Sequence, residues 1–205
     1  MLSLRQTPVT VLLLVAILAV FGLEMVRGAT TDLQALMDLG ANNRMAVLQY
    51  GQWWRLVTSM FLHGGFLHIL FNGWALVQLG GLFERWLGSG RLLFTYLATG
   101  LCGSLASVLF ASSVTKVSVG ASGAIFGLLG ALIAFLLRRR NRLAAAGKSI
   151  LGQLVFWAGL NLFLGASMPM IDNNAHIGGL VAGFVVGLLL RERRTEQPAE
   201  AEIPV

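Results

Sequence analysis

The 205-residue sequence predicts an all-α integral membrane protein: a bundle of six transmembrane helices with an interfacial loop between the first two. Hydrophobic residues make up 56%, charged residues only 12%, and the mean hydropathy is +0.76, which lies outside the range of soluble globular domains. Six windows are apolar over nearly the 20 residues that cross a hydrocarbon core. Most basic residues lie at the ends of these windows. We therefore expect one membrane domain over 1–191, followed by a polar tail over 192–205.

The expected helices follow one another along the whole domain. They lie near 9–26, 62–83, 92–112, 120–137, 149–166 and 174–190. The first window has Arg5 before it and a short apolar core, so a cleaved signal peptide is an alternative interpretation. The residues that follow, FGLEMVRGAT over 21–30, lack a small-x-small cleavage site and favour a retained helix. Cys102 is the only cysteine, which excludes an internal disulfide and a thiolate metal cluster.

The connection over 27–60 is too polar to span the membrane and too long to be a simple turn. It contains the sequence QWWR over 52–55, and tryptophans beside an arginine suit the headgroup layer. We expect short amphipathic helices in the interface here, with anchoring as their simplest role. The tail over 192–205 is charged and contains proline, so we expect it to be disordered.

The net charge of +6 does not indicate a nucleic-acid partner, because the basic residues lie at helix ends rather than on one solvated surface. The positive-inside rule explains them better. It predicts a multi-pass protein with both termini cytoplasmic, in the inner membrane of a bacterium. Eleven basic residues are then inside: Arg5, Arg85, Arg91, Arg138, Arg139, Arg140, Arg142, Lys148, Arg191, Arg193 and Arg194. Four are outside: Arg27, Arg44, Arg55 and Lys116.

Polar residues of the second, fourth and sixth windows lie at one depth. Counted to the first charged residue at the inner end, His68 is 16 residues from Glu84, Ser122 is 16 from Arg138, and His176 is 15 from Arg191. Sixteen residues rise about 24 Å of a core about 30 Å thick. These side chains therefore lie a little below the outer boundary, where they need partners or a water-filled cavity. His63 and Asn72 belong to the same helix as His68.

Small residues predict that the fourth and sixth helices pack closely. His176, Gly179 and Gly183 share one helix face, and glycines four residues apart allow near-backbone contact. The start of the fourth window is also rich in small residues, namely Gly120, Ala121, Gly123, Gly127 and Gly130. This packing would bring His176 within reach of Ser122.

A serine next to a histidine suits nucleophilic catalysis, in which a base removes the hydroxyl proton and nearby donors hold an oxyanion. Ser122 lies where a glycine-rich loop becomes a helix, so free backbone N–H groups point at the site. Singly, each residue also has a structural interpretation: GASG as a packing sequence, Asn72 as an interhelical hydrogen-bonder. A metal site is disfavoured because His63 and His68, five apart on one helix, would face different directions, and Asp172 is the only nearby acid.

These motifs resemble those of the rhomboid family of intramembrane serine proteases. The resemblance covers residues 5–191 and keeps the family's order, through the sequences WWR (53–55), HGGFLHILFN (63–72), GASG (120–123) and AHIGGLVAG (175–183). It implies a six-helix rhomboid-like bundle with a catalytic dyad of Ser122 and His176. It also implies an oxyanion hole made by His68, Asn72 and the backbone N–H of Ser122.

The resemblance assigns supporting roles to the remaining residues. Gly179 and Gly183 would let the sixth helix close on the fourth, and Phe126 stands where the family often has tyrosine, able to stack on His176 but without a hydroxyl. Supporting structural roles are implied for Gly120, Gly123, His63, Trp54 and Arg55.

The implied activity is cleavage of transmembrane segments of other membrane proteins near their outer ends, without metal or cofactor. Substrates would unwind locally, carry small residues at the cut, and carry helix breakers just beyond it. The loop over 166–174 is a candidate lid, and the fifth helix a candidate gate. Two alternatives remain. The first is a non-catalytic rhomboid-like protein that binds transmembrane helices without cutting them, although such proteins typically lack one or both of the residues that match Ser122 and His176. The second is a transporter or proton channel, which would need further polar residues along the helices toward the inner side of the membrane.

Overall fold

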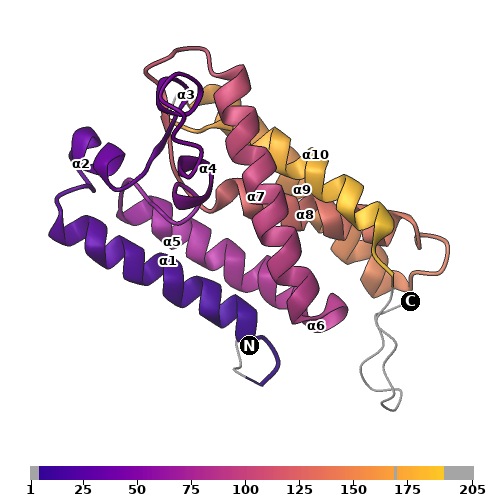
Figure 1. The fold of residues 1–205 in the computed structure, drawn as a ribbon. Helices are drawn as coiled ribbons and strands as arrows, with labels where there is room; N and C mark the ends of the chain where they lie inside the picture. The colour runs from indigo at the N-terminus through magenta and orange to yellow at the C-terminus, as the bar shows by residue number, and fades with distance from the viewer. Residues whose placement is uncertain (1–4, 169, 192–205) are drawn as a thin grey trace.

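The computed structural model describes residues 5–168 and 170–191, which form a helical bundle with a smaller lobe of short helices at one end (Figure 1). The predicted tail over 192–205 lies outside the described residues. In chain order the elements are α1 (Pro8–Val26), α2 (Leu33–Asp38), β1 (Asn42–Asn43), α3 (Arg44–Leu48), α4 (Arg55–Thr58), α5 (Phe66–Ala75), the π-helical turn η1 (Leu76–Gly80), α6 (Gly81–Leu87), α7 (Ser89–Phe110), β2 (Val117–Ser118), α8 (Ser122–Leu137), α9 (Ala145–Ser167) and α10 (Asn173–Leu189).

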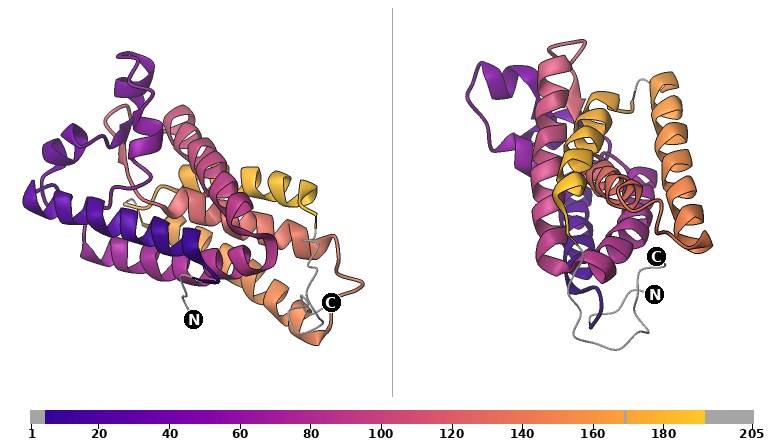
Figure 2. Two further views of the ribbon diagram at one scale, coloured as in Figure 1. Left: turned by 60° about the horizontal axis from the view of Figure 1, so that its bottom comes forward. Right: turned by 90° about the vertical axis from the view of Figure 1, so that its right-hand side faces the viewer.

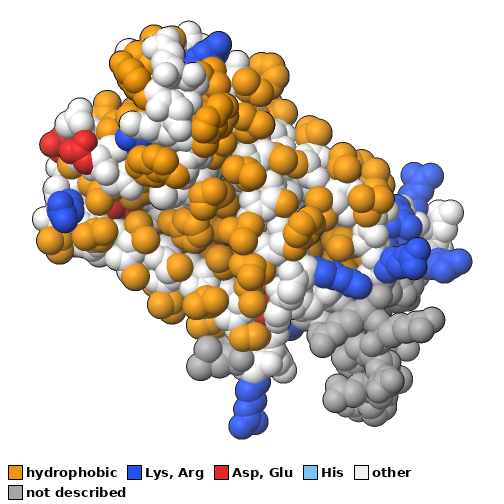
Figure 3. Space-filling model, viewed as in Figure 1, with side chains coloured by type: hydrophobic (Ala, Val, Ile, Leu, Met, Phe, Trp, Pro, Cys, Tyr) orange, Lys and Arg blue, Asp and Glu red, His pale blue; other side chains and the backbone are white. Residues whose placement is uncertain are grey.

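The predicted all-helical membrane bundle is confirmed. Four helical segments among the described residues are long and apolar enough to cross a membrane: α1, the continuous α5–η1–α6 segment, α7 and α9. The apolar helices α8 and α10 are shorter, with 16 and 17 residues. Figure 3 shows hydrophobic side chains over the flank of the bundle and lysines and arginines gathered at one end. The number of six spans therefore stays a prediction.

Helix α8 is the centre of the bundle. Every residue from Gly123 to Leu136 is buried, as expected for a helix that is apolar on all sides. Helices α7 and α10 cover two of its sides, and the right-hand view of Figure 2 shows α9 standing at the edge of the bundle. Only 17% of the apolar window of α9 is buried, against 50% for α7. A helix enclosed by protein need not match the thickness of the lipid core, which explains how α8 can be short.

Glycines bring α10 into backbone contact with α8. A Cβ atom added at Gly179 would overlap the carbonyl oxygen of Gly123, and one at Gly183 would overlap that of Gly127. One turn further on, Gly187 meets the carbonyl oxygen of Ala131 in the same way. The two helices therefore pack along a seam of small residues, the arrangement that spacing by four favours.

The second predicted helix begins later than expected. It starts at Phe66, because Gly65 has φ +151°, a backbone conformation that L side chains rarely adopt. His63 therefore lies in the preceding loop and not on the helix. At its other end the segment continues to Leu87, and Glu84 is buried, not a charge at the helix end as the depth comparison assumed.

The Glu84 carboxylate is bound to the start of α1. It accepts hydrogen bonds from the backbone N–H groups of Val9 (2.9 Å) and Thr10 (2.8 Å) and from the Thr10 hydroxyl (2.7 Å). The Ser89 hydroxyl adds a fourth, at 2.7 Å. These N–H groups belong to the first turn of α1, where helices have no internal acceptors and favour negative charge. The contact joins α1 to the end of α6.

The 27–60 connection is tied to the bundle by polar contacts. Strand β1 pairs antiparallel with β2, with Asn42 opposite Ser118. The Asn42 amide nitrogen also donates to the Ser104 carbonyl on α7, at 2.9 Å. Arg55 is buried and donates from Nη1 to the carbonyl oxygens of Met37 (2.6 Å) and Ala41 (2.9 Å), with its guanidinium over the Trp54 ring. The loop is therefore a folded lobe that packs on α7.

Candidate active site

Ser122 is the first residue of α8 and follows a turn that only glycine favours. Gly120 has φ +124°, and its N–H donates to the Ser59 carbonyl at 2.9 Å, which holds this turn against the lobe. The first N–H groups of a helix have no intrahelical acceptor and carry the positive end of the helix dipole. Ser122 thus lies beside backbone donors that can stabilise a negative oxygen.

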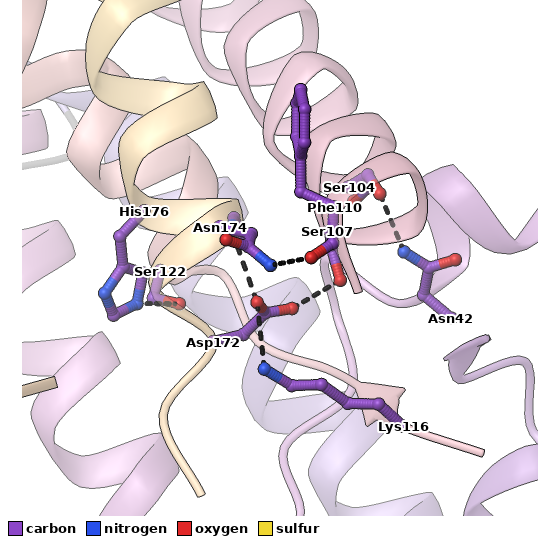
Figure 4. Close-up of polar contacts among 10 residues, drawn as sticks. Asn42, Ser104, Ser107, Phe110, Lys116, Ser122, Asp172, Asn174 and His176 are labelled. Carbon is purple, nitrogen blue, oxygen red and sulfur yellow. Dashed lines mark hydrogen bonds and ion pairs between the residues drawn. The ribbon is translucent and has the colours of Figure 1, made fainter. Parts of the chain in front are cut away.

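His176, on the first turns of α10, faces Ser122 across the seam. Its Nε2 lies 2.9 Å from the Ser122 Oγ (Figure 4). When the hydroxyl donates to Nε2, the remaining proton of the neutral ring is on Nδ1, which has no hydrogen-bond partner among the described residues. Phe126 stacks on the imidazole, with ring centroids 4.2 Å apart and planes 9° from parallel. The two sequence-predicted residues therefore form a hydrogen-bonded pair with a ring that holds the histidine.

Asp172, the acid nearest this end, is engaged elsewhere. Its carboxylate caps the N-terminus of α10 through the Ala175 N–H, accepts from the Ser107 hydroxyl, and forms an ion pair with Lys116 at 3.4 Å (Figure 4). Burial opposes ionisation of Asp172, but bonds from Ser107 and Ser118 and the Lys116 charge together hold its pKa below the usual value. Asp172 therefore fixes the helix that carries His176 without contacting the imidazole.

His68 and Asn72 lie on α5, and the His68 ring lies against Gly120, two residues before Ser122. A Cβ atom at Gly120 would lie 2.7 Å from the His68 Nε2 and 3.6 Å from the Ser122 Oγ, so the missing side chain leaves room for the imidazole at the site. The Asn72 amide nitrogen donates to the His68 carbonyl on its own helix, at 2.9 Å. In this conformation its amide is bound to backbone and makes no hydrogen bond to Ser122.

His63 supports the turn before Ser122. The Ala121 N–H points at its Nε2 at 3.5 Å, while its Nδ1 lies 3.2 Å from the Phe61 carbonyl, which fits a ring with the proton on Nδ1. The His63 ring is also 5.1 Å from the His68 ring, centroid to centroid. The expectation that these two histidines face apart was therefore wrong, because it placed both on one helix. Within 5–168 and 170–191, no three His, Cys, Asp or Glu side chains gather as a metal site requires.

Glu24 is a polar residue near the site that the sequence reasoning missed. It lies on α1, is fully buried, and accepts a 2.8 Å hydrogen bond from the His63 N–H. The chain of contacts from Glu24 through His63 to Ala121 ends next to Ser122. The signal that could have found Glu24 is its position in the sequence. An acidic residue within an apolar helix is expected to face the interior of the bundle.

A cavity of about 480 Å³ opens beside α10, between the loop after α7 and the link from α9 to α10. The link includes much of the predicted lid, of which residue 169 lies outside the described residues. The residues around the cavity are Ser112, Ser113, Lys116, Gly165, Ala166, Ser167, Met168, Ile171, Asn173 and Asn174.

The fold and site together define an integral membrane protein with a partly buried serine–histidine pair where two close-packed helices begin. The family model of the rhomboid domain matches residues 50–193. The chain belongs to the rhomboid family.

Curated relatives agree with this assignment. The chain is 42% identical to Rhomboid protease GluP of Bacillus subtilis over 175 residues, 85% of this chain and 33% of that protein. It is 41% identical to RHOMBOID-like protein 5 of Arabidopsis thaliana over 163 residues, 78% of this chain and 50% of that one. RHOMBOID-like protein 7 of the same plant is 42% identical over 155 residues, 76% and 48% of the two chains. The chain therefore spans between a third and a half of the length of these relatives.

Proposed function

We propose that the protein is an intramembrane serine endopeptidase in which Ser122 is the nucleophile and His176 the general base. The observation that carries the proposal is the 2.9 Å contact between the Ser122 Oγ and the His176 Nε2, within the range for proton transfer. Ser122 attacks the carbonyl carbon of a peptide bond while Nε2 takes the hydroxyl proton. The C–N bond then breaks, and His176 returns the proton to the leaving amine. Water hydrolyses the resulting ester by the same proton transfers in turn.

The oxyanion of each tetrahedral intermediate would be held by the Ser122 backbone N–H and by the His68 side chain. The position of His68 Nε2 beside Gly120 supports its role. A hydrogen bond from that atom requires the ring tautomer with the proton on Nε2. Asn72 joins this set only if its side chain turns away from the His68 carbonyl. Donors placed before the charge develops are worth several kcal/mol, about 10²–10³-fold in rate for one donor.

The substrates we propose are transmembrane segments of other membrane proteins. A helical peptide bond is hydrogen-bonded and shielded, so the substrate must unwind locally before its carbonyl reaches Ser122, which favours small and helix-breaking residues near the cut. We place the Ser122 end of the bundle toward the outer side of a bacterial inner membrane and both termini in the cytoplasm, as the distribution of basic residues favours. Helix α9, the least buried long helix, and the 166–174 link are the candidate gate and lid.

Cleavage of a helix-breaker-containing transmembrane substrate in liposomes tests the dyad. We expect cleavage by the wild type and by the control Ser149→Ala, whose hydroxyl accepts a hydrogen bond from Gln153 on the exposed face of α9. We expect none by Ser122→Ala or His176→Ala. Equal cleavage by Ser122→Ala would refute the assignment, and loss of activity with a strong chelator would point to a metal mechanism.

A fluorophosphonate probe, which labels activated serines, distinguishes the alternative of a non-catalytic helix-binding protein. Such a protein would capture the substrate without cutting it and would leave Ser122 unlabelled.

A further inference from the structure

A second cavity, of about 530 Å³, lies at the opposite end of the bundle from Ser122. It is formed between the segment that follows α8 and Arg191, which lies two residues after the end of α10. Arginines gather at this end in Figure 3. The described residues around the cavity are Arg138, Arg139, Asn141, Arg142 and Arg191, so four of these five residues are arginines.

Contacts within the bundle hold this cavity in shape. Arg138 donates from Nη1 to the Leu188 and Leu190 carbonyls, at the end of α10 where helices leave acceptors unpaired. Arg91 donates to the Arg191 carbonyl at 2.6 Å, and the Arg139 guanidinium lies 3.8 Å from the centre of the Phe135 ring. A positive-inside bias requires basic charge at this end but not the convergence of four arginines from two distant segments on one space.

We propose that this cavity binds the phosphate of an anionic phospholipid headgroup. The planar guanidinium group matches pairs of phosphate oxygens, and basic pockets between helix ends suit lipid headgroups. Next to these arginines along the chain are exposed leucines, Leu137, Leu188 and Leu189, the last 76% exposed. These side chains can contact the acyl chains of a lipid directly below its bound headgroup. Inorganic phosphate has no acyl chains and could not make these contacts. The proposal goes beyond the proteolytic activity and does not depend on it.

The test is lipid binding by the purified full chain in detergent, measured by native mass spectrometry. Phosphatidylglycerol is titrated, with phosphatidylcholine as the zwitterionic comparison and inorganic phosphate as a competitor. The informative variant is Arg142→Gln, because the Arg142 side chain makes no hydrogen bond within the described residues and its loss leaves the end of α10 intact. Arg140→Gln is the matched control: it removes the same charge two residues away, from an exposed side chain that does not line the cavity.

We expect the wild type and Arg140→Gln to retain phosphatidylglycerol equally and in preference to phosphatidylcholine. Arg142→Gln should bind it at least about fivefold more weakly, from about 1 kcal/mol for each arginine near a lipid phosphate. Equal weakening in both variants would overturn the proposal in favour of diffuse surface charge. Competition by inorganic phosphate at the concentration of the lipid would overturn it in favour of a free-anion site. A melting curve of each variant shows that it is folded.

Discussion

The seam between α8 and α10 allows a sharp test of how packing sets catalytic geometry. In Gly179→Ala, the new Cβ would overlap the Gly123 carbonyl oxygen and lie 2.9 Å from its carbonyl carbon, whereas ordinary contact begins near 3.4 Å. Neither backbone can rotate away, since both are inside helices. Helix α10 must therefore move from α8 by about 1 Å, an overpacking that typically costs about 1–3 kcal/mol of folding free energy.

His176 lies one turn before Gly179 on the same face, so the displacement reaches it directly. The distance from its Nε2 to the Ser122 Oγ would grow from 2.9 Å to more than the limit of about 3.2 Å for proton transfer. Misplacement of a reacting group by about 1 Å lowers the rate about 10²-fold. We therefore expect Gly179→Ala to react about 10²-fold more slowly while it still folds.

The assay compares the rate of fluorophosphonate labelling of Ser122, and of substrate cleavage in liposomes, with the melting temperature of each variant. The control is Gly22→Ala on α1, where an added Cβ meets nothing within 4 Å. It should keep wild-type rates and gain up to about 1 kcal/mol, since alanine favours a helix. Wild-type rates in Gly179→Ala would refute the argument that close packing at this glycine sets the serine–histidine distance.

Three further changes test other contacts. Glu84→Gln places an amide among four hydrogen-bond donors and should lower the free energy of unfolding by about 3 kcal/mol. Thr10→Val removes only one of these hydrogen bonds and should lower it by about 1 kcal/mol. Equal losses, measured by unfolding in detergent, would contradict the role of the Glu84 carboxylate in binding the start of α1. Phe126→Leu should lower the cleavage rate severalfold by removing a ring stack worth about 0.5–1.5 kcal/mol, whereas Phe126→Tyr should keep it; equal rates for all three proteins would exclude the stack. The low pKa of Asp172 means that its carboxylate stabilises the fold at neutral pH and that this contribution disappears as the pH falls through that pKa. The melting temperatures of wild type and Asp172→Asn should therefore differ at pH 7 and converge below the ordinary aspartate pKa of 3.8, and a difference independent of pH would argue against this role.

The sequence alone predicted the membrane bundle and the two helix faces that meet at the site. Glycines spaced by four after His176, and small residues around Ser122, are local patterns that mark which faces can approach closely. Matched depth along separate helices follows from the constant rise per residue, although one end of that comparison, Glu84, proved to be buried against α1.

Which side chains bond to one another was decided only by the tertiary structure. The glycine pair before α5 moved His63 off the helix and next to His68, and Asn72 turned to its own backbone rather than to Ser122. Glu24 met the His63 loop from a helix 39 residues earlier in the chain. Spacing along a helix determines the direction in which a side chain leaves it, and this is a local property. Its hydrogen-bond partner depends on rotamers and on helix separation, which the packing of the whole bundle sets.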